Sequence, residues 1–470
     1  MWKINPAKVL ANKINLTSKD DLLTFSPVKN LSFSDHNLVT GQMEKSIKFL
    51  IATVSFFLLI FTFIACNSSN NHKESTELPK VSITTENGAE ITSKEVYIAA
   101  TVSISNVKDE WLLDEVEAGV RGRGNTSWEE PKKPYRIKFK SKQEIFGHAK
   151  AKSWTLIANY CDKSLSRNYL AYTLASKMDG IEFSSMAEFV DLYLNGRYLG
   201  VYLLCDQIEV GEGRINVEEE SSDIDTGYLL EMNFRAPMEG ELDWDYFFAK
   251  DLFPAYTIKS PATDEDYYSQ EQLYYIKDYL SNAYAAILSR DMQAIHQYID
   301  INSFIDCYIV HELFCSVDVP FSSFYLYKKK NGVLYAGPVW DFDRSSGNVN
   351  YGPGQKESQS PRAALWVAKT NPWYQALLDV PEIKTILQKR LADAQLNIAE
   401  IIAECDTLAT THNKSFQKNF VKWPIMGEYV APNPDDVVAI KTVKGQLAFL
   451  KDWLTARNQY MLMMYDVSID

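Results

Sequence analysis

Residues 321–348 read FSSFYLYKKKNGVLYAGPVWDFDRSSGN, and this stretch decides the fold of the region around it. Two segments, 323–329 and 333–339, have the composition and alternation of β-strands. They are separated by Asn331-Gly332, a dipeptide whose residues both tolerate positive φ. The sequence therefore predicts a β-hairpin, with acidic residues directly after its second strand.

Three carboxylates are expected to meet at the open end of this hairpin. A symmetric turn places Ser322 opposite Asp341, with Cβ atoms about 5 Å apart. Asp318 precedes the first strand on the same side, and Asp343 follows the second strand. Carboxylates this close repel one another, and a hard cation such as Mg²⁺ relieves that repulsion while binding phosphate oxygens. The alternative is a solvated loop with ordinary acidic turn residues.

Composition excludes several classes of protein. The chain has 470 residues, of which 46% are hydrophobic and 13% aromatic, so it can bury one large core or two fused ones and is not a disordered chain. A formal net charge of −13 argues against a nucleic-acid binder, which normally carries a basic face, and no nucleic-acid partner is expected. The 6 cysteines form no Cys-x-x-Cys pair. We therefore expect no disulfide framework or cysteine zinc site, and most of the cysteines after Cys66 to be small core residues.

The N-terminal region carries a targeting signal. From Met43 it reads MEKSIKFLIATVSFFLLIFTFIACNSSNNHKES, with two lysines, an apolar run and then a cysteine. This layout predicts a signal peptide over 43–65, because the run is short of the roughly 20 apolar residues of a membrane-spanning helix. A signal anchor is the alternative. Residues 66–79 are expected to form a flexible tether, and residues 1–42 to be an overlong gene start.

Phe63-Ile64-Ala65-Cys66 resembles a bacterial lipobox, in which a small residue precedes a cysteine that becomes diacylated. The aromatic Phe63 departs from the usual leucine. The resemblance implies lipidation of Cys66 and an exported protein anchored in the cell envelope, on its periplasmic or outer-surface face. The alternative is an unmodified cysteine within the membrane.

The rest of the chain divides into a strand-rich part, about 80–260, and a helical part, about 261–470. Alternating segments and an Asn195-Gly196 turn predict antiparallel strands in the first part. Helical spacing of apolar residues predicts helices over about 162–178, 264–315, 372–410 and 436–466. The predicted fold class is α+β.

A series of motifs runs through the chain in order: RGN at 123–125 with Trp128, KKPYRIKF from Lys132, SWTLIANYCDKSLSRN from Ser153, VDLYLNGRYLGVYLL from Val190, VDVPFSSFYLYKK from Val317 and GPVWDFDRSSGN from Gly337. Together they resemble the CotH kinase family of atypical, protein-kinase-like proteins. The resemblance covers roughly residues 80–460, and its specificity lies in the ordered series. It implies a two-lobed kinase-like fold, with ATP bound on divalent metal between a strand-rich lobe and a helical lobe.

The resemblance also implies roles at the hairpin. Asp318 matches the catalytic aspartate, which orients or accepts the proton of an attacking hydroxyl. Asp341 matches the metal-binding aspartate of a Trp-Asp-x-Asp motif that Asp343 completes, with Mg²⁺ or Mn²⁺ as the ion. Ser323 occupies the cofactor-binding position at which kinase-like loops usually carry an asparagine for a second metal. A serine hydroxyl is a weaker ligand, so a slow or inactive enzyme is an open alternative.

Four residues of the strand-rich part are candidates for contact with the phosphates of ATP: Arg123, Asn125, Arg136 and Lys138. Arg136 and Lys138 alternate with apolar residues, so both cations share one face of a strand. The alternative is a solvated strand face. Arg123 and Asn125 lie in a glycine-bearing turn, although GRGN is not itself a phosphate-loop motif.

Two other pairs of residues have weaker signals. His311-Glu312 lies on a predicted helix, but Cys315 stands where a zinc protease has its second histidine. We therefore expect His311 at the edge of the core. Arg167 and Asn168 open a predicted helix, as solvated polar residues or as ligands.

Two functions from different classes follow. One is an ATP- and metal-dependent kinase acting on hydroxyl groups of secreted or surface proteins. The other is a non-catalytic surface lipoprotein that binds proteins or glycans on the same fold, with Trp366, Trp373 and Trp423 as a sugar-stacking surface. Scarce ATP outside the cytoplasm counts against the first function. The convergence of Asp318 with Asp341 counts for it.

Overall fold

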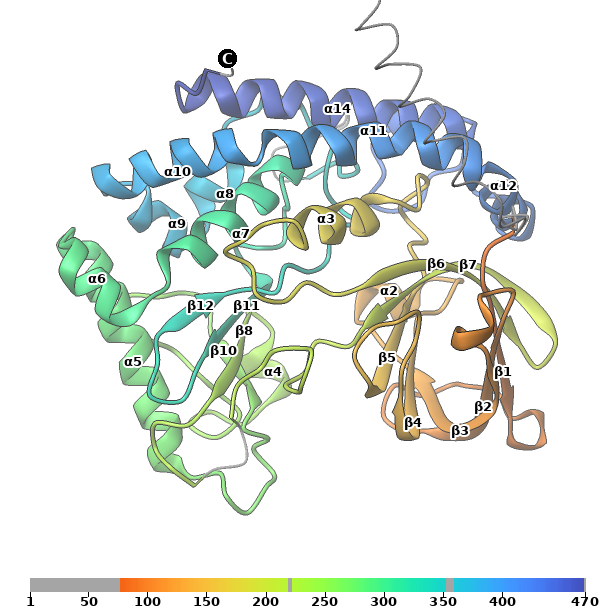
Figure 1. The fold of residues 1–470 in the computed structure, drawn as a ribbon, viewed down its shortest axis with the longest axis horizontal. Coiled ribbons are helices and arrows are strands. Elements are labelled where there is room, and N and C mark those ends of the chain that lie inside the picture. Colours follow the sequence, from red (N-terminus) through yellow and green to blue (C-terminus); the bar gives the residue numbers. More distant parts are fainter. Residues whose placement is uncertain (1–76, 219–221, 352–358, 469–470) are drawn as a thin grey trace, which may run out of the picture. The chain divides into compact units, whose positions relative to one another are not determined.

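The computed structural model describes residues 77–218, 222–351 and 359–468. The predicted signal peptide, Cys66 and most of the tether lie outside the described residues, as do residues 1–42. Within the described ranges, no helix is long and apolar enough to cross a membrane. Strands dominate the N-terminal part and helices the C-terminal part, which confirms the α+β class (Figure 1).

Seven strands close into a barrel in the order β1-β2-β3-β4-β5-β7-β6. They are β1 (Lys80–Thr85), β2 (Ile98–Ser105), β3 (Leu113–Gly122), β4 (Tyr135–Gln143), β5 (Ala151–Ile157), β6 (Ala187–Leu194) and β7 (Arg197–Asp206). Alternation along β4 decides which side chains fill the barrel. Tyr135, Ile137 and Phe139 are buried in its core, whereas Arg136 and Lys138 face away from that core.

The barrel closes through one local turn and one distant pairing. Asn195 and Gly196 join β6 to β7 with φ of 50° and 75°, as the Asn-Gly signal predicts. The parallel pairing of β1 with β6 then removes the last free edge. Helix α12 (Asn413–Lys422) packs on β7, where Asn419 Oδ1 accepts hydrogen bonds from Val201 N–H at 3.1 Å and Lys132 Nζ at 3.0 Å.

A second sheet has the order β12-β11-β8-β10-β9. Its strands are β8 (Tyr228–Asn233), β9 (Tyr246–Phe247), β10 (Tyr256–Ser260), β11 (Ser322–Lys328) and β12 (Leu334–Ala336). The predicted hairpin is β11 and β12, but β12 is shorter than predicted because Pro338, just beyond it, has no N–H for a strand ladder. Leu326 pairs with Ala336, which differs by one residue from the predicted register. Pairing of β11 with β8 joins residues from both sides of position 260.

Helices make up most of the remainder (Figure 1). Besides α12 they are α2 (Thr126–Glu129), α3 (Arg167–Ala175), α4 (Ala236–Glu239), α5 (Gln270–Ser289), α6 (Met292–Tyr298), α7 (Ile301–Phe314), α8 (Trp366–Thr370), α9 (Pro372–Leu377), α10 (Pro381–Asp393), α11 (Gln395–Thr411), α13 (Asp435–Val438) and α14 (Val443–Met464), with 3₁₀ turns η2 (Glu86–Gly88) and η3 (Asp109–Trp111). Helix α3 starts later than predicted. The Asp162 carboxylate bonds to the N–H groups of Ser164 and Arg167, which holds the preceding residues in a turn.

Helix α7 is the centre of the helical part. It is buried along nearly its whole length and contacts α3, α8, α10 and α14. Glu312 on α7 forms a fully buried ion pair with Arg457 of α14, and also accepts the N–H groups of Trp366 and Ala368 on α8. These bonds satisfy the buried charges. They also fix the C-terminal end of α7, from which the chain continues to Asp318.

The cysteines of the described residues, 161, 205, 307, 315 and 405, are all buried and free, as predicted. His311 is also buried, and its ring stacks on Phe342 with centroids 5.2 Å apart. Of the three tryptophans proposed for sugar stacking, Trp373 is fully buried and donates its Nε1–H to Tyr256 Oη at 2.8 Å. Trp373 therefore belongs to the core.

Candidate active site

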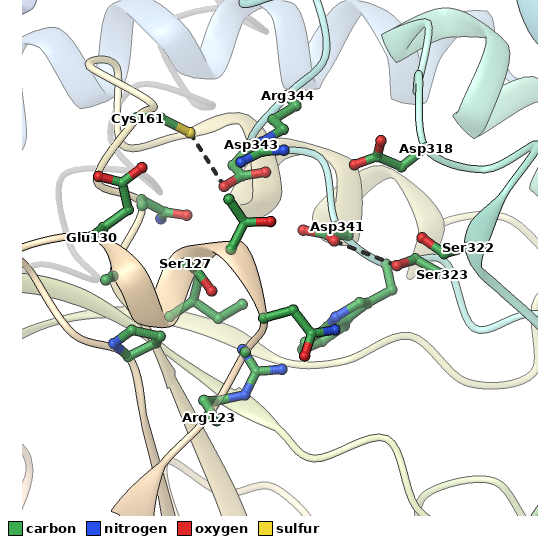
Figure 2. Close-up of a pocket in the computed structure, with 18 of the residues that line it drawn as sticks. Arg123, Ser127, Glu130, Cys161, Asp318, Ser322, Ser323, Asp341, Asp343 and Arg344 are labelled. Carbon is green, nitrogen blue, oxygen red and sulfur yellow. Dashed lines mark hydrogen bonds between the residues drawn. The ribbon is translucent and has the colours of Figure 1, made fainter. Parts of the chain in front are cut away.

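A cavity of about 330 Å³ is lined by residues of the barrel, of the second sheet and of the segment after β12. This volume is in the range of small-molecule sites. Six of the predicted site residues line it: Arg123, Asn125, Asp318, Ser323, Asp341 and Asp343. In Figure 2, Asp341 and Asp343 lie between Arg123, Ser127 and Glu130 on one side and Asp318 on the other.

The other two predicted phosphate contacts, Arg136 and Lys138, do not line this cavity. Both lie on the outer face of the barrel. Arg136 Nη2 is 3.2 Å from Ser153 Oγ and 3.5 Å from the Glu209 carboxylate, and Lys138 is exposed. The tertiary structure thus separates these two cations from the six residues that it brings together.

The Trp-Asp-x-Asp segment is held from behind by α3. Phe342 N–H donates to Asn168 Oδ1 at 2.7 Å, and Asp341 N–H lies 3.4 Å from Tyr172 Oη. Phe342 itself is fully buried. Because the residue between the two aspartates is anchored in the core, Asp341 and Asp343 are held at the cavity (Figure 2).

Two residues of the site have an uncommon backbone conformation. Asp341 and Ser323 have φ of 68° and 59°, in the left-handed region that non-glycine residues rarely adopt. Ser323 is the bulge at which the register between β11 and β8 shifts. Its Oγ lies 3.4 Å from Asp341 Oδ2. Such strain is typical of functional sites, and here it accompanies the contact between the two side chains.

Asp318 sits in a tight turn after α7. Its carbonyl oxygen accepts the N–H groups of Phe321 and Ser322, both at 2.8 Å, and its side chain lines the cavity. Burial, and then the negative charge of Asp341, raise the pKa of Asp318 to about 6, while Arg344 and Arg235 oppose the rise. A carboxylate with a pKa close to neutral is ionised at pH 7 and is a better proton acceptor than an ordinary aspartate.

The carboxylates next to Asp318 form an oxygen-donor set for a cation. Among the described residues, no group of three or more His, Cys, Asp or Glu side chains could hold a metal ion by itself. Mg²⁺, however, is usually bound by one or two carboxylates together with phosphate oxygens and water. Burial and the charge of Asp341 raise the pKa of Asp343 to about 7, and a bound cation would relieve that repulsion. Asp341, Asp343 and Ser323 therefore fit Mg²⁺ or Mn²⁺ that is completed by a phosphate ligand.

The barrel contacts the Trp-Asp-x-Asp segment, residues 340–343, through a stack of side chains. The Arg123 guanidinium lies 5.5 Å from the ring centroid of Trp340, and Trp340 stacks on Tyr172 with centroids 5.3 Å apart and planes at 11°. The stack joins the glycine-bearing turn of the barrel to the residue before Asp341. Asn125 lines the cavity beside it.

Sequence reasoning missed several residues of the cavity. Cys161 Sγ–H donates to Asp343 Oδ2 at 3.3 Å, and the charge of Asp343 raises the pKa of Arg344 although burial opposes the rise. Cys161 lies in the motif SWTLIANYCDKSLSRN and Arg344 in the motif GPVWDFDRSSGN, so their place in these motifs could have identified them as site residues. Glu130, whose pKa burial raises, and Arg235 had no such signal.

Comparison with known families agrees with these motifs. The family model described as CotH kinase protein matches residues 120–461, a range that includes every cavity residue discussed above. A search of curated proteins found no match to the chain. Because the family match covers well over half of the sequence, the chain belongs to the CotH kinase protein family.

Proposed function

We propose that this chain is an atypical kinase that transfers a phosphoryl group from ATP, with a divalent cation, to hydroxyl groups of secreted or surface proteins. The observation that carries the proposal is the placement of Asp318 at the same cavity as Asp341 and Asp343. A protein that only binds a partner has no need of a carboxylate with a raised pKa beside a metal-binding pair. Membership of a kinase-like family supports this function.

In this proposal the barrel and the helical part are the two lobes of a kinase-like fold. Asp341, Asp343 and Ser323 hold the cation, and Arg123 and Asn125 approach the phosphates from the barrel wall. Bound ATP with its cation supplies the activated phosphoryl group and offsets its charge. Asp318 would orient the acceptor hydroxyl and accept its proton on a carboxylate oxygen, as the bond between the hydroxyl oxygen and the γ-phosphorus of ATP forms and the bond between that phosphorus and ADP breaks, releasing ADP.

The second candidate function is a non-catalytic binding protein on the same fold. Ser323 favours it, because a serine hydroxyl replaces the amide oxygen that would hold a second metal. The second candidate binds proteins or glycans and transfers no phosphate, so phosphate transfer distinguishes the two.

The variant Asp318→Asn separates the two functions. Asparagine keeps the size and hydrogen-bonding capacity of the side chain but cannot accept the proton. Binding of ATP with Mg²⁺, measured by calorimetry, should persist, whereas transfer of radiolabelled phosphate should fall about 10² to 10⁴-fold. Asp393→Asn, an exposed position outside the cavity, is the matched control.

Equal transfer by Asp318→Asn and the unchanged protein would show that Asp318 is not the base. If the unchanged protein binds ATP but phosphorylates neither itself nor any acceptor, the non-catalytic binding protein becomes the better supported function.

We also propose that the chain is exported and anchored in the cell envelope by lipid on Cys66. The apolar run before this cysteine and the polar stretch after it support the proposal. In cells fed labelled fatty acid, Cys66→Ser should remove the label and leave an unprocessed precursor. Unchanged lipid incorporation would contradict the anchor.

A further inference from the structure

Arg235 is a cation at the Asp318 end of the cavity. It follows β8, and its neighbour Phe234 donates its N–H to Phe321 O at 2.9 Å. Phe321 N–H in turn donates to Asp318 O at 2.8 Å, so a short chain of backbone bonds connects Arg235 with the turn of Asp318. Both side chains line the same cavity, and the charge of Arg235 acts on the Asp318 carboxylate.

The guanidinium of Arg235 has hydrogen-bonding capacity to spare. Its Nε is buried and has no hydrogen-bond partner among the described residues. The Glu239 carboxylate lies 3.5 Å from Nε, but its side chain is 50% exposed, and exposed pairs one helical turn apart are weak. Nε itself is enclosed, so an incoming acceptor would meet the terminal Nη nitrogens, which donate no hydrogen bond to a described residue.

The other cations of the cavity serve other groups. In the proposed function Arg123 faces the phosphates of ATP, and Arg344 is hydrogen-bonded to Tyr351 and lies next to Asp343. Lys132 donates to Val201 O at 2.5 Å and to Asn419 Oδ1 at 3.0 Å. Arg235 is therefore the cation best placed to meet a group that approaches Asp318.

The surface beside Arg235 suits a polypeptide. Phe234 and Phe321 are 45% and 46% exposed on neighbouring segments, and the guanidinium lies 4.9 Å from the centroid of the Phe234 ring. Stacking on an aromatic ring leaves the edge of a guanidinium free for a bidentate contact with a carboxylate. With a net charge of −13, the chain would otherwise repel an acidic segment.

We propose that Arg235 determines acceptor specificity by binding a carboxylate side chain next to the hydroxyl that Asp318 activates. The preferred acceptor is then a polypeptide segment in which an acidic residue adjoins the serine or threonine. This inference rests on the proposed function, because it takes the group at Asp318 to be an acceptor hydroxyl.

The test uses the full chain and three fluorescent peptides that differ in one residue, Glu, Gln or Lys, beside a single serine. Binding is followed by anisotropy, and transfer is followed with ATP and Mg²⁺. The unchanged protein should bind the Glu peptide about 5- to 20-fold more tightly than the Gln peptide, as expected for a charge-assisted hydrogen bond. Arg235→Gln should abolish this preference by raising KM for the Glu peptide at unchanged kcat.

Two further variants sharpen the result. Arg235→Lys keeps the charge but loses the bidentate geometry, so it should restore only part of the preference. Arg362→Gln changes an exposed arginine outside the cavity and should behave as the unchanged protein. Urea unfolding of each variant confirms that the fold persists.

Equal binding of the Glu and Gln peptides by the unchanged protein would overturn the inference. So would an equal loss of kcat on all peptides in Arg235→Gln, because Arg235 would then act on the transferred group. An Arg235-dependent preference for the Glu peptide without any transfer would support the binding specificity while removing the proposed kinase activity.

Discussion

Replacing Asn168 with leucine is expected to displace Asp341 and Asp343, the aspartates of the proposed metal site, without changing either of them. Asn168 Oδ1 accepts hydrogen bonds from Phe342 N–H at 2.7 Å and from Tyr172 Oη at 3.2 Å, and its amide nitrogen donates to Asn159 Oδ1 at 2.9 Å. Asn168 is 1% exposed, so water has little access to these groups. Leucine has a similar size but no polar atom.

The magnitude follows from the groups left without partners. A buried donor or acceptor that loses its hydrogen bond costs about 1–3 kcal/mol. Once the Tyr172 hydroxyl has turned to another acceptor, two such groups remain, Phe342 N–H and Asn159 Oδ1, so the free energy of unfolding should fall by about 2–6 kcal/mol. Asn168→Asp keeps an acceptor for Phe342 and Tyr172, but it loses the donor to Asn159 and buries a carboxyl group beside Asn159 Oδ1. It should therefore also lower the free energy of unfolding, by more than the about 1–3 kcal/mol of the lost hydrogen bond alone.

The assay combines urea unfolding, followed by tryptophan fluorescence, with calorimetry of ATP and Mg²⁺ in the absence of urea. Asn168→Leu should bind ATP with Mg²⁺ about 10- to 100-fold more weakly, the range found when a residue supporting a metal ligand is removed. Asn302→Ala, exposed on α7, is the control. A leucine variant with the unfolding midpoint and the ATP affinity of the unchanged protein would refute the role of Asn168.

Three other variants test the site and its support. Burial lowers the pKa of His311 to about 3, below its unfolded value of about 6.5. The stabilisation of the fold by the neutral His311 ring is therefore complete above pH 6.5 and is lost as the pH falls towards 3. The loss between pH 7 and pH 5 is about 2 kcal/mol, and His311→Phe should show a drop in unfolding free energy smaller by that amount; an equal drop in both proteins would contradict this assignment. Ser323→Asn should tighten metal-dependent ATP binding, because asparagine is the better cation ligand and tolerates the φ of 59°; calorimetry showing weaker binding would argue against Ser323 as a ligand. Asp341→Ala should weaken ATP binding only when Mg²⁺ or Mn²⁺ is present. If each protein binds ATP equally well with and without the metal, Asp341 is not a metal ligand.

Much of the site could be predicted because its residues lie in short motifs. Asp318, Ser323, Asp341 and Asp343 flank the hairpin that Asn331-Gly332 predicted, although residues 329–333 join its strands and only Asn331 of that pair has a positive φ. The supporting residues could not be predicted in the same way. Nothing local shows that Asn168 bonds to Phe342, or that Cys161 reaches Asp343, because these contacts depend on how α3 packs against a distant segment.

The sequence alone therefore determined the α+β class, both Asn-Gly hairpins, the buried cysteines and the residues at the hairpin mouth, since turns and alternation are set by neighbouring residues. Only the tertiary structure decided that β1 pairs with β6, that β11 pairs with β8, and that Arg136 and Lys138 face away from the cavity. Alternation shows that two side chains share a face of a strand, but it does not show whether that face contacts the cavity, the core or solvent. That depends on burying the apolar faces of all the elements at once, and it is this packing that brings Arg235 to Asp318.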